Sequence, residues 1–401
     1  MGTGAAPVFH VARPARHPGP LTGAGGNRVD VPAADRWGGM KTSMNEPAGA
    51  LRRRAAERPP AQLVCVALSP SIDVTYVVPA LVPGTIHRPP QVYRVAGGKG
   101  FNVARAAHTL GATVVATGVL GGDTGAWMVT MLSRTGIRMA SVKGAQPTRT
   151  CVSVADRATG QLTEFYEPAP PITPRAWAEL LATVVKICEE NPSWVSLSGS
   201  LPPGPVPEAI VDLVEAAQGA GARVAVDTHS TALAAAVGAG ADLVKVNVEE
   251  AAAVLGLGPG TGWSSPGATG PEDGDGPARR RPGTRPALDP TALAGKLLAA
   301  SPGTEIAIVT AGADGVVLAG RDGTGLRMHL DVRGDYPIGS GDSFLGGLLT
   351  GLARAPGDVA AAARLAMGAG AANALTPGAG VLDAGTAHEL AERVEITEII
   401  P

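Results

Sequence analysis

The sequence PIGSGDSFLGGLLTGL, at residues 337–352, places a glycine-rich step directly before an apolar helical pattern. The apolar residues recur at helical spacing and fall on one stripe: Phe344, Leu345, Leu348, Leu349 and Leu352. Such a helix begins with free backbone N–H groups, here from Gly339, Ser340 and Gly341, and its dipole favours an anion in front of them. The stretch therefore predicts an anion-binding helix start.

Asp342 places a carboxylate beside this predicted anion site. A base next to an anion cradle is the arrangement that phosphoryl transfer to a hydroxyl group requires. An aspartate at a helix start is more often a cap or a partner of the helix dipole. On this stretch alone, both interpretations stay open.

Strand-type and helix-type patterns alternate through most of the chain. The apolar runs of strand type lie at 63–68, 113–120, 194–199, 223–227, 243–247 and 305–310. Amphipathic helical runs lie between most of them, at 102–110, 174–190, 207–218 and 356–375. This order predicts an α/β fold with a mostly parallel sheet covered on both faces. Ligands of such sheets bind beyond the carboxyl ends of the strands, where the chain has Asp73, Ser198, Gly199, Asp227, Asn247 and residues 310–312.

Two stretches depart from this alternation. Residues 74–95 and 149–167 alternate with period two and carry turn signals, which predicts a small antiparallel sheet. Such a sheet can act as a lid over a site, and an ordinary edge hairpin is the alternative. Residues 1–60 and about 257–290 are rich in Pro and Gly without periodicity, so we predict a disordered extension and a disordered insertion.

The composition and net charge of the chain argue against several classes of protein. Lys and Arg number 33 and Asp and Glu number 35, so the net charge of −2 predicts no general attraction to nucleic acid or membrane. Three cysteines without CxxC spacing argue for a reducing compartment and against a disulfide scaffold or zinc site. No apolar run approaches ~20 residues and the N-terminus lacks an apolar signal core, so we expect a cytoplasmic protein.

The sequence AGGKGFNVARAAHTLG at 96–111 carries groups suited to a polar ligand. Gly97 and Gly98 allow close backbone approach, and Lys99 supplies a compact positive charge. The chain has only six lysines, so a lysine within a motif is less often a surface residue without a specific role. Asn102 offers a donor and an acceptor to a polyol. The alternative is a glycine-rich turn with a solvated lysine.

Other candidate residues lie near predicted strand ends and helix starts. Asp73, at the end of the first predicted strand, could accept two sugar hydroxyls, and Arg149 could bind a phosphate with its guanidinium fork. A turn-forming aspartate and a surface arginine are the alternatives. Asn247 and Glu250 fall on one helix face and could hold a hydrated magnesium ion through water, or could simply form a capping pair. The strand and glycine turn at 308–318 suit a nucleotide contact or a plain hairpin.

The order and spacing of these motifs resemble the ribokinase-like sugar kinases, the PfkB family. The matching pieces are GGKGFNVARAAHTLG, SGSLPPG (198–204), VDTHSTAL (226–233), KVNVEEA (245–251), VTAGADG (309–315) and IGSGDSFLGG (338–347). The resemblance covers about residues 62–383. It implies a three-layer α/β sandwich with a small antiparallel β lid, as one kinase domain over 61–395. Lys99, Arg149 and SGSLPPG resemble the phosphosugar branch, which includes 1-phosphofructokinase and tagatose-6-phosphate kinase.

The resemblance also implies a role for each candidate residue. It makes Asp342 the catalytic base, with an anion hole formed by Gly339, Ser340 and Gly341. The sugar would be held by Asp73, Gly97, Gly98 and Asn102, and the phosphate that it already carries by Lys99 and Arg149. The residues facing ATP would be Lys245, Thr310, Gly312 and Gly315. Magnesium would be organised through water by Asn247 and Glu250.

We therefore expect ATP- and Mg²⁺-dependent phosphorylation of a ketohexose phosphate, with fructose 1-phosphate converted to fructose 1,6-bisphosphate. The alternatives are a tagatose-6-phosphate or fructose-6-phosphate kinase, a kinase of an unphosphorylated sugar or nucleoside, and a non-catalytic sugar-phosphate sensor. Lys99 and Arg149 argue against a neutral substrate, because a neutral polyol needs neither charge. The resemblance also implies a homodimer that forms through the lid.

Overall fold

The computed structural model describes residues 62–205, 208–257 and 288–400. The predicted extension at 1–60 lies outside the described residues, and so does most of the predicted insertion. Helix α7 (Val248–Val254) precedes the gap at 258–287, and helix α8 (Pro290–Ala300) begins shortly after it.

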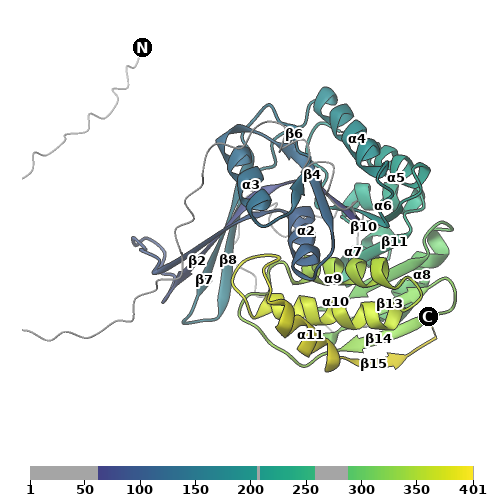
Figure 1. Ribbon diagram of the computed structural model, residues 1–401. Coiled ribbons are helices and arrows are strands. Elements are labelled where there is room, and N and C mark those ends of the chain that lie inside the picture. The colour runs from purple at the N-terminus through teal and green to yellow at the C-terminus, as the bar shows by residue number, and fades with distance from the viewer. Residues whose placement is uncertain (1–61, 206–207, 258–287, 401) are drawn as a thin grey trace, which may run out of the picture. The chain divides into compact units, whose positions relative to one another are not determined.

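A large, mostly parallel sheet forms the centre of the fold (Figure 1). Its strand order is β15-β14-β13-β12-β11-β10-β9-β1-β4-β5, and β6 pairs with β4. The parallel strands are β1 (Leu63–Ala67), β4 (Val114–Leu120), β5 (Arg138–Met139), β6 (Val142–Lys143), β9 (Trp194–Ser198), β10 (Arg223–Asp227), β11 (Leu243–Asn247) and β12 (Ile306–Thr310). An antiparallel edge is added by β13 (Val316–Gly320), β14 (Gly325–His329) and β15 (Glu395–Glu398). The six predicted strands are confirmed.

Helices cover both faces of this sheet because alternate strand residues are apolar on both sides. Val64 and Val66 of β1 pack in one buried cluster, whereas Leu63 and Cys65 pack in another. The first cluster includes residues from α4 (Pro174–Cys188), α5 (Ala209–Gly219), α6 (Ser230–Gly238), α7 and α8. The second includes residues from α2 (Lys99–Thr109), α3 (Gly122–Arg134), α9 (Ser340–Arg354) and α10 (Val359–Ala374). Helix α11 (Ala384–Glu392) packs against α10. The predicted three-layer sandwich is confirmed.

A second, four-stranded sheet projects from one side of the body (Figure 1). Its strands, in the order β3-β2-β7-β8, are β2 (Ser71–Val78), β3 (Gln91–Gly97), β7 (Arg149–Asp156) and β8 (Gln161–Tyr166). The outer pairs are antiparallel as predicted, and the central pair, β2 with β7, is parallel. We call this sheet the lid sheet. None of the described helices is long and apolar enough to cross a membrane.

Two local predictions about strand and helix ends were wrong. Asp73 does not end the first strand, because β1 stops at Ala67 and Asp73 is the third residue of β2 in the lid sheet. The helix predicted at 102–110 begins earlier, because α2 starts at Lys99 with Gly98 as its N-cap at φ 85°. Only glycine adopts this φ readily, and a Cβ on Gly98 would lie 2.8 Å from the Ser69 carbonyl oxygen.

Candidate active site

The start of helix α9 forms one wall of the candidate site. Gly339 caps it in the left-handed conformation, at φ 82°, and a Cβ there would lie 2.6 Å from the nitrogen of Gly380. The N–H groups of Gly341 and Asp342 lie in the first turn, which has no intrahelical acceptors. The Ser340 N–H donates to the Pro337 carbonyl at 3.1 Å, so the prediction that this amide is free was wrong.

A buried asparagine of α10, Asn373, fixes the loop before this helix. Its Nδ2 donates to the Ile338 carbonyl at 2.9 Å, and its Oδ1 accepts from the Gly380 N–H at 2.7 Å. Its Oδ1 also accepts from the Ser343 hydroxyl at 3.0 Å. The sequence analysis missed Asn373, although an asparagine in the alanine-rich run 369–374 is a signal of a buried polar contact.

Asp342 is 7% exposed and lies in the first turn of α9, where it contacts Asn102 of α2. Its Oδ2 accepts a hydrogen bond from Asn102 Nδ2 at 2.9 Å. Burial and the negative charge of Asp227 raise the pKa of Asp342 to about 6, while Lys99 and Asn102 oppose this rise. A carboxyl group with this pKa is ionised at neutral pH and binds a proton more readily than an ordinary aspartate, which suits a general base.

Asp227 holds two lysines beside this carboxyl group. Lys99 Nζ donates to its Oδ1 at 2.7 Å, and Lys245 Nζ donates to its Oδ2 at 2.6 Å. Burial alone would raise the pKa of Asp227, but the two ammonium groups outweigh burial and hold this pKa well below its usual range. Burial would lower the pKa of Lys99, but Asp227 and Asp342 raise it above its ordinary value. Both charges of the pair are therefore kept at neutral pH.

The two lysines lie nearer to each other than their predicted roles imply. Lys245 is 6% exposed, and a Cβ on Gly341 would lie 3.2 Å from its Nζ. Lys245 thus contacts the start of α9, and Lys99 shares its carboxylate partner. We call Lys99, Asp227 and Lys245 the lysine–aspartate cluster. Sequence reasoning noted Asp227 only as a strand-end residue, and the signal that could have singled it out is the charged end of the buried run RVAVD.

The predicted sugar-binding residues converge where the lid sheet joins the body. Asp73 Oδ1 accepts from the Ser71 hydroxyl at 2.6 Å, and its Oδ2 accepts from the Gly98 N–H at 3.3 Å. A Cβ on Gly97 would lie 2.0 Å from Asp73 Oδ2, so only glycine allows this approach. Burial raises the pKa of Asp73, while its hydrogen bonds and the nearby Arg105 and Arg149 oppose the rise.

Arg149 begins strand β7 of the lid sheet, opposite Ser71 of β2. Its Nη1 donates to the Glu167 carbonyl at 3.1 Å, whereas its buried Nε has no hydrogen-bond partner among the described residues. The hydroxyls of Ser69 and Ser198 are also buried without a partner there. Buried polar atoms that lack partners within the chain are suited to a polar ligand or water.

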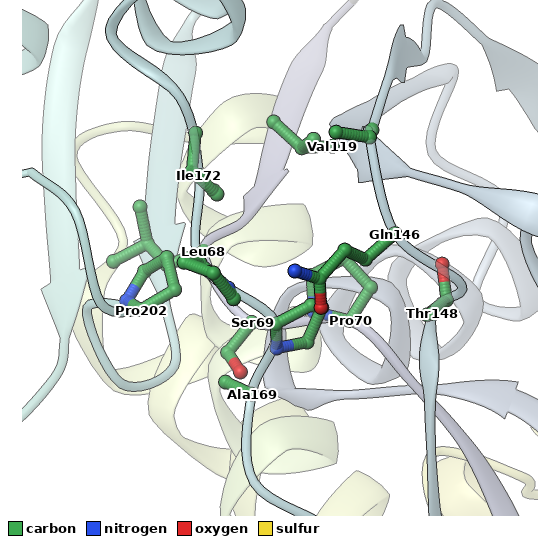
Figure 2. A pocket seen from close by; sticks show the side chains of 13 residues that line it. Leu68, Ser69, Pro70, Val119, Gln146, Thr148, Ala169, Ile172 and Pro202 are labelled. Carbon is green, nitrogen blue, oxygen red and sulfur yellow. The ribbon is translucent and has the colours of Figure 1, made fainter.

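Ser69 also lines a small pocket of about 20 Å³ close to where the lid sheet begins (Figure 2). Gln146 and Thr148 lie on one side of the view in Figure 2, and Pro202 of the SGSLPPG segment lies on the other. The residues lining it do not include Asp342 or the lysine–aspartate cluster. The pocket is therefore separate from the groups suited to proton and phosphoryl transfer.

The predicted magnesium residues form a capping box at the start of α7. Asn247 Oδ1 accepts from the Glu250 N–H at 2.7 Å, and Glu250 Oε2 accepts from the Asn247 N–H at 2.9 Å. The capping alternative is confirmed, and the magnesium role stays a prediction. A carboxylate accepts about four hydrogen bonds, so Glu250 keeps lone pairs for water around a cation. The described residues hold no cluster of three or more His, Cys, Asp or Glu that could bind a metal directly.

The predicted ATP residues are gathered only in part. Thr310 pairs with Asn247 across β11 and β12, so these two residues lie side by side at the carboxyl edge of the sheet. Gly312 has φ 58° in a short 3₁₀ helix, Gly312–Asp314. Gly315 has a structural reason to be glycine, because a Cβ there would lie 2.2 Å from the Met328 carbonyl oxygen of β14.

Comparison with known proteins gives consistent matches. The model of the pfkB family carbohydrate kinases matches residues 60–384. A 1-phosphofructokinase from Rhodobacter capsulatus is 33% identical over 172 residues, which are 43% of this chain and 54% of that protein. A tagatose-6-phosphate kinase from Staphylococcus epidermidis is 32% identical over 171 residues, with the same coverage of 43% and 54%. The chain spans about half the length of the curated relatives it matches.

Among solved structures, the tetrameric inhibited form of phosphofructokinase-2 from Escherichia coli is similar to this chain with a TM-score of 0.69 and 25% identity. The match covers 83% of this chain and 98% of that one.

Proposed function

We propose that this chain, which belongs to the pfkB family of carbohydrate kinases, transfers the γ-phosphoryl group of ATP to a hydroxyl group of a sugar phosphate. The observation that carries this proposal is the Asp342 carboxyl group, buried at the start of α9 and held by Asn102 beside the lysine–aspartate cluster. The names of the two curated relatives, both sugar-phosphate kinases, support the substrate class.

In the proposed reaction, Asp342 accepts the proton of the substrate hydroxyl group. The hydroxyl oxygen forms a bond to the γ-phosphorus, and the bond from that phosphorus to the leaving oxygen of ADP breaks. The N–H groups of Gly341 and Asp342, with the ammonium group of Lys245, would stabilise the negative charge of the transferred group. Lys99 lies in the same cluster, so we assign it to a phosphate close to the point of transfer.

We propose a ketohexose phosphate as substrate, with fructose 1-phosphate as the first candidate and tagatose 6-phosphate or fructose 6-phosphate next. The guanidinium of Arg149 has an unused hydrogen-bond donor, because its buried Nε has no partner among the described residues. This free donor supports a substrate that carries a phosphate. Asp73, Gly97, Gly98 and Asn102 would bind the sugar hydroxyls. Two contacts support this assignment: Asn102 bonds to Asp342, and Asp73 lies on β2, whose Ser71 pairs with Arg149.

ATP and Mg²⁺ are the proposed cofactors. Mg²⁺ prefers oxygen ligands and keeps several waters, and when bound it would neutralise negative charge on the phosphates. Asn247 and Glu250 would hold it through water, and their oxygen donors fit this hard cation. Thr310, Gly312 and Gly315 would lie on the nucleotide side.

We also propose a homodimer in the cytoplasm, formed through the lid sheet. Apolar side chains are exposed on or beside this sheet at Ile86, Val92, Phe165 and Tyr166. Covering these side chains with a second copy would remove apolar surface from water. Light scattering coupled to size-exclusion chromatography tests the assembly, with Phe165→Glu as the variant expected to shift it to monomer.

The experiment that tests the proposed function is an ADP-release screen over free sugars, nucleosides and sugar phosphates. We expect turnover with ketohexose phosphates and at least 10-fold lower kcat/KM with free fructose, because a charge-assisted phosphate contact contributes roughly 1.5–3 kcal/mol. Preference for a free sugar or a nucleoside would replace this proposal with a neutral-substrate kinase. Binding of a sugar phosphate without ADP release would favour a sensor.

A further inference from the structure

A single arginine, Arg105, joins three segments of the candidate site. It lies on α2, one turn after Asn102. Its Nη1 donates to Asn102 Oδ1 at 3.2 Å and to the Ala379 carbonyl oxygen at 2.7 Å. Its Nη2 donates to the Ala96 carbonyl oxygen. The planar guanidinium has several donors in a fixed geometry, so these bonds restrict the groups that it contacts.

The bond to Asn102 determines which end of that amide faces Asp342. With Oδ1 held by Arg105, Nδ2 is directed at Asp342 Oδ2, at 2.9 Å. A flipped amide would place Oδ1 against the carboxylate, so two acceptors would meet without a proton between them. It would also turn the NH₂ group toward the guanidinium donors. Arg105 thus disfavours the flipped amide at both ends.

The two carbonyl bonds connect the substrate side with the helix that carries Asp342. Ala96 precedes Gly97 and Gly98, which lie against Asp73. Ala379 precedes Gly380, and a Cβ on Gly380 would lie 2.7 Å from Asn102 Cα. The same loop contacts Gly339, the cap of α9. A movement of Arg105 would therefore disturb both the sugar side and the start of α9.

We propose that Arg105 is a positioning residue of phosphoryl transfer, which acts through Asn102 to orient the Asp342 carboxylate. This inference rests on the proposed role of Asp342 as the base. Burial lowers the pKa of Arg105 to about 10, while Asp73 and Asp342 oppose this, so the side chain stays charged at neutral pH. The other groups that face Asp342 are Asp227, Lys99 and Lys245, and none of these contacts Arg105 through a hydrogen bond in the structure.

The test compares Arg105→Lys with a matched control, Arg354→Lys. Arg354 also links two helices through a carbonyl, since its Nη2 donates to the Leu110 carbonyl oxygen at 2.5 Å, but it contacts no residue of the site. For Arg105→Lys we expect kcat to fall by about 10- to 100-fold, because misplaced catalytic groups lose rate steeply, with little change in KM for ATP. For Arg354→Lys we expect a lower melting temperature and an unchanged kcat.

The pH profile of kcat/KM supplies a readout that a purely structural role would not move. In the wild type its acid limb reports protonation of Asp342, near pH 6. A weaker hydrogen bond from Asn102 disfavours the carboxylate, so the acid limb of Arg105→Lys should shift to higher pH. The limb of Arg354→Lys should not shift.

A double-mutant cycle asks whether Arg105 acts through Asn102. In an Asn102→Ala background, Arg105→Lys should lower kcat by less than about twofold. The inference would be overturned if the losses of kcat in the two single variants multiplied in the double variant and the acid limb of the pH profile did not shift. Arg105→Gln repeats the cycle if the lysine variant fails to fold. Asn102→Asp tests the contact between residue 102 and Asp342. The aspartate still accepts from Arg105 but offers Asp342 no N–H donor. If the acid limb of the kcat/KM profile does not shift in this variant, the inference is also refuted.

The outcome for Arg105 can be separated from that of the proposed function. If Asp342→Asn keeps a near-normal kcat, the proposed base is wrong whatever Arg105 does. If Asp342→Asn loses turnover while Arg105→Lys alters only the melting temperature, the proposed function stands and the positioning role fails.

Discussion

Asp342→Asn separates the proposed catalytic role of this residue from a structural one, because the two side chains have nearly the same shape. The asparagine Oδ1 can still accept the hydrogen bond from Asn102, so the contact at 2.9 Å is retained. The amide cannot take the substrate proton. We therefore expect kcat to fall by ~10²–10⁴-fold, the usual contribution of a positioned base.

The same substitution should stabilise the fold at neutral pH. The pKa of Asp342 rises from an ordinary value of 3.8 to about 6, so the folded state holds the proton more tightly than the unfolded state does. The unfolding free energy therefore falls as pH rises from about 4 to about 6, in total by about 3 kcal/mol. Asparagine carries no charge and avoids this loss. Above pH 6 the variant should be more stable than the wild type by up to about 3 kcal/mol, and at pH 4 the difference should vanish.

The assay measures ADP release and thermal or denaturant unfolding of the two proteins between pH 4 and 8. Asp358→Asn is the control, since Asp358 is the N-cap of α10 and its side chain accepts from the Ala361 N–H at 2.9 Å. Asparagine is also a good cap, so this variant should change neither kcat nor stability by much. A folded Asp342→Asn protein with near-normal kcat, or one less stable than the wild type at pH 7, would refute the reasoning.

The remaining predictions concern the charged groups around this carboxylate. Arg149→Ala should lower kcat/KM for fructose 1-phosphate by about 10- to 150-fold, with less effect on free fructose. Lys99→Ala should lower kcat/KM by a similar factor for both sugars, because Lys99 lies in the cluster beside Asp342. A Lys99→Ala defect confined to KM for ATP would assign Lys99 to the nucleotide instead. Asp227→Asn should destabilise the protein by about 3–5 kcal/mol in denaturant unfolding, because it leaves two ammonium groups unpaired, and a loss below ~1 kcal/mol would show that solvent reaches them. Glu250→Gln keeps the capping box, so the melting temperature should hold while the Mg²⁺ concentration for half-maximal rate rises about 10-fold or more; an unchanged Mg²⁺ requirement would leave Glu250 as a cap only.

Local sequence patterns were enough to predict the layers of the fold and most of the segments that form the candidate site. The period of apolar residues is a local property, so runs such as LVCVAL and RVAVD predicted buried strands, and their alternation with helical runs predicted the covered parallel sheet. Asp342 and Asn102 were also accessible to sequence reasoning, because each lies in a glycine-rich step at a predicted helix start. Helix and strand ends were less certain, as the early start of α2 at Lys99 and the place of Asp73 within β2 show.

Which of these residues contact one another could be seen only in the folded chain. Lys99 and Asp227 are 128 positions apart, and Asn102 and Asp342 are 240 apart, so no local pattern encodes either contact. Arg105 and Asn373 each lie among alanines in a helical sequence, and their partners Ala379 and Gly380 come from a loop that these helices contact only after packing. The physical reason is that parallel strands bring their carboxyl ends to one edge of the sheet, whereas the charges collected there set each pKa through distances that exist only in the folded chain.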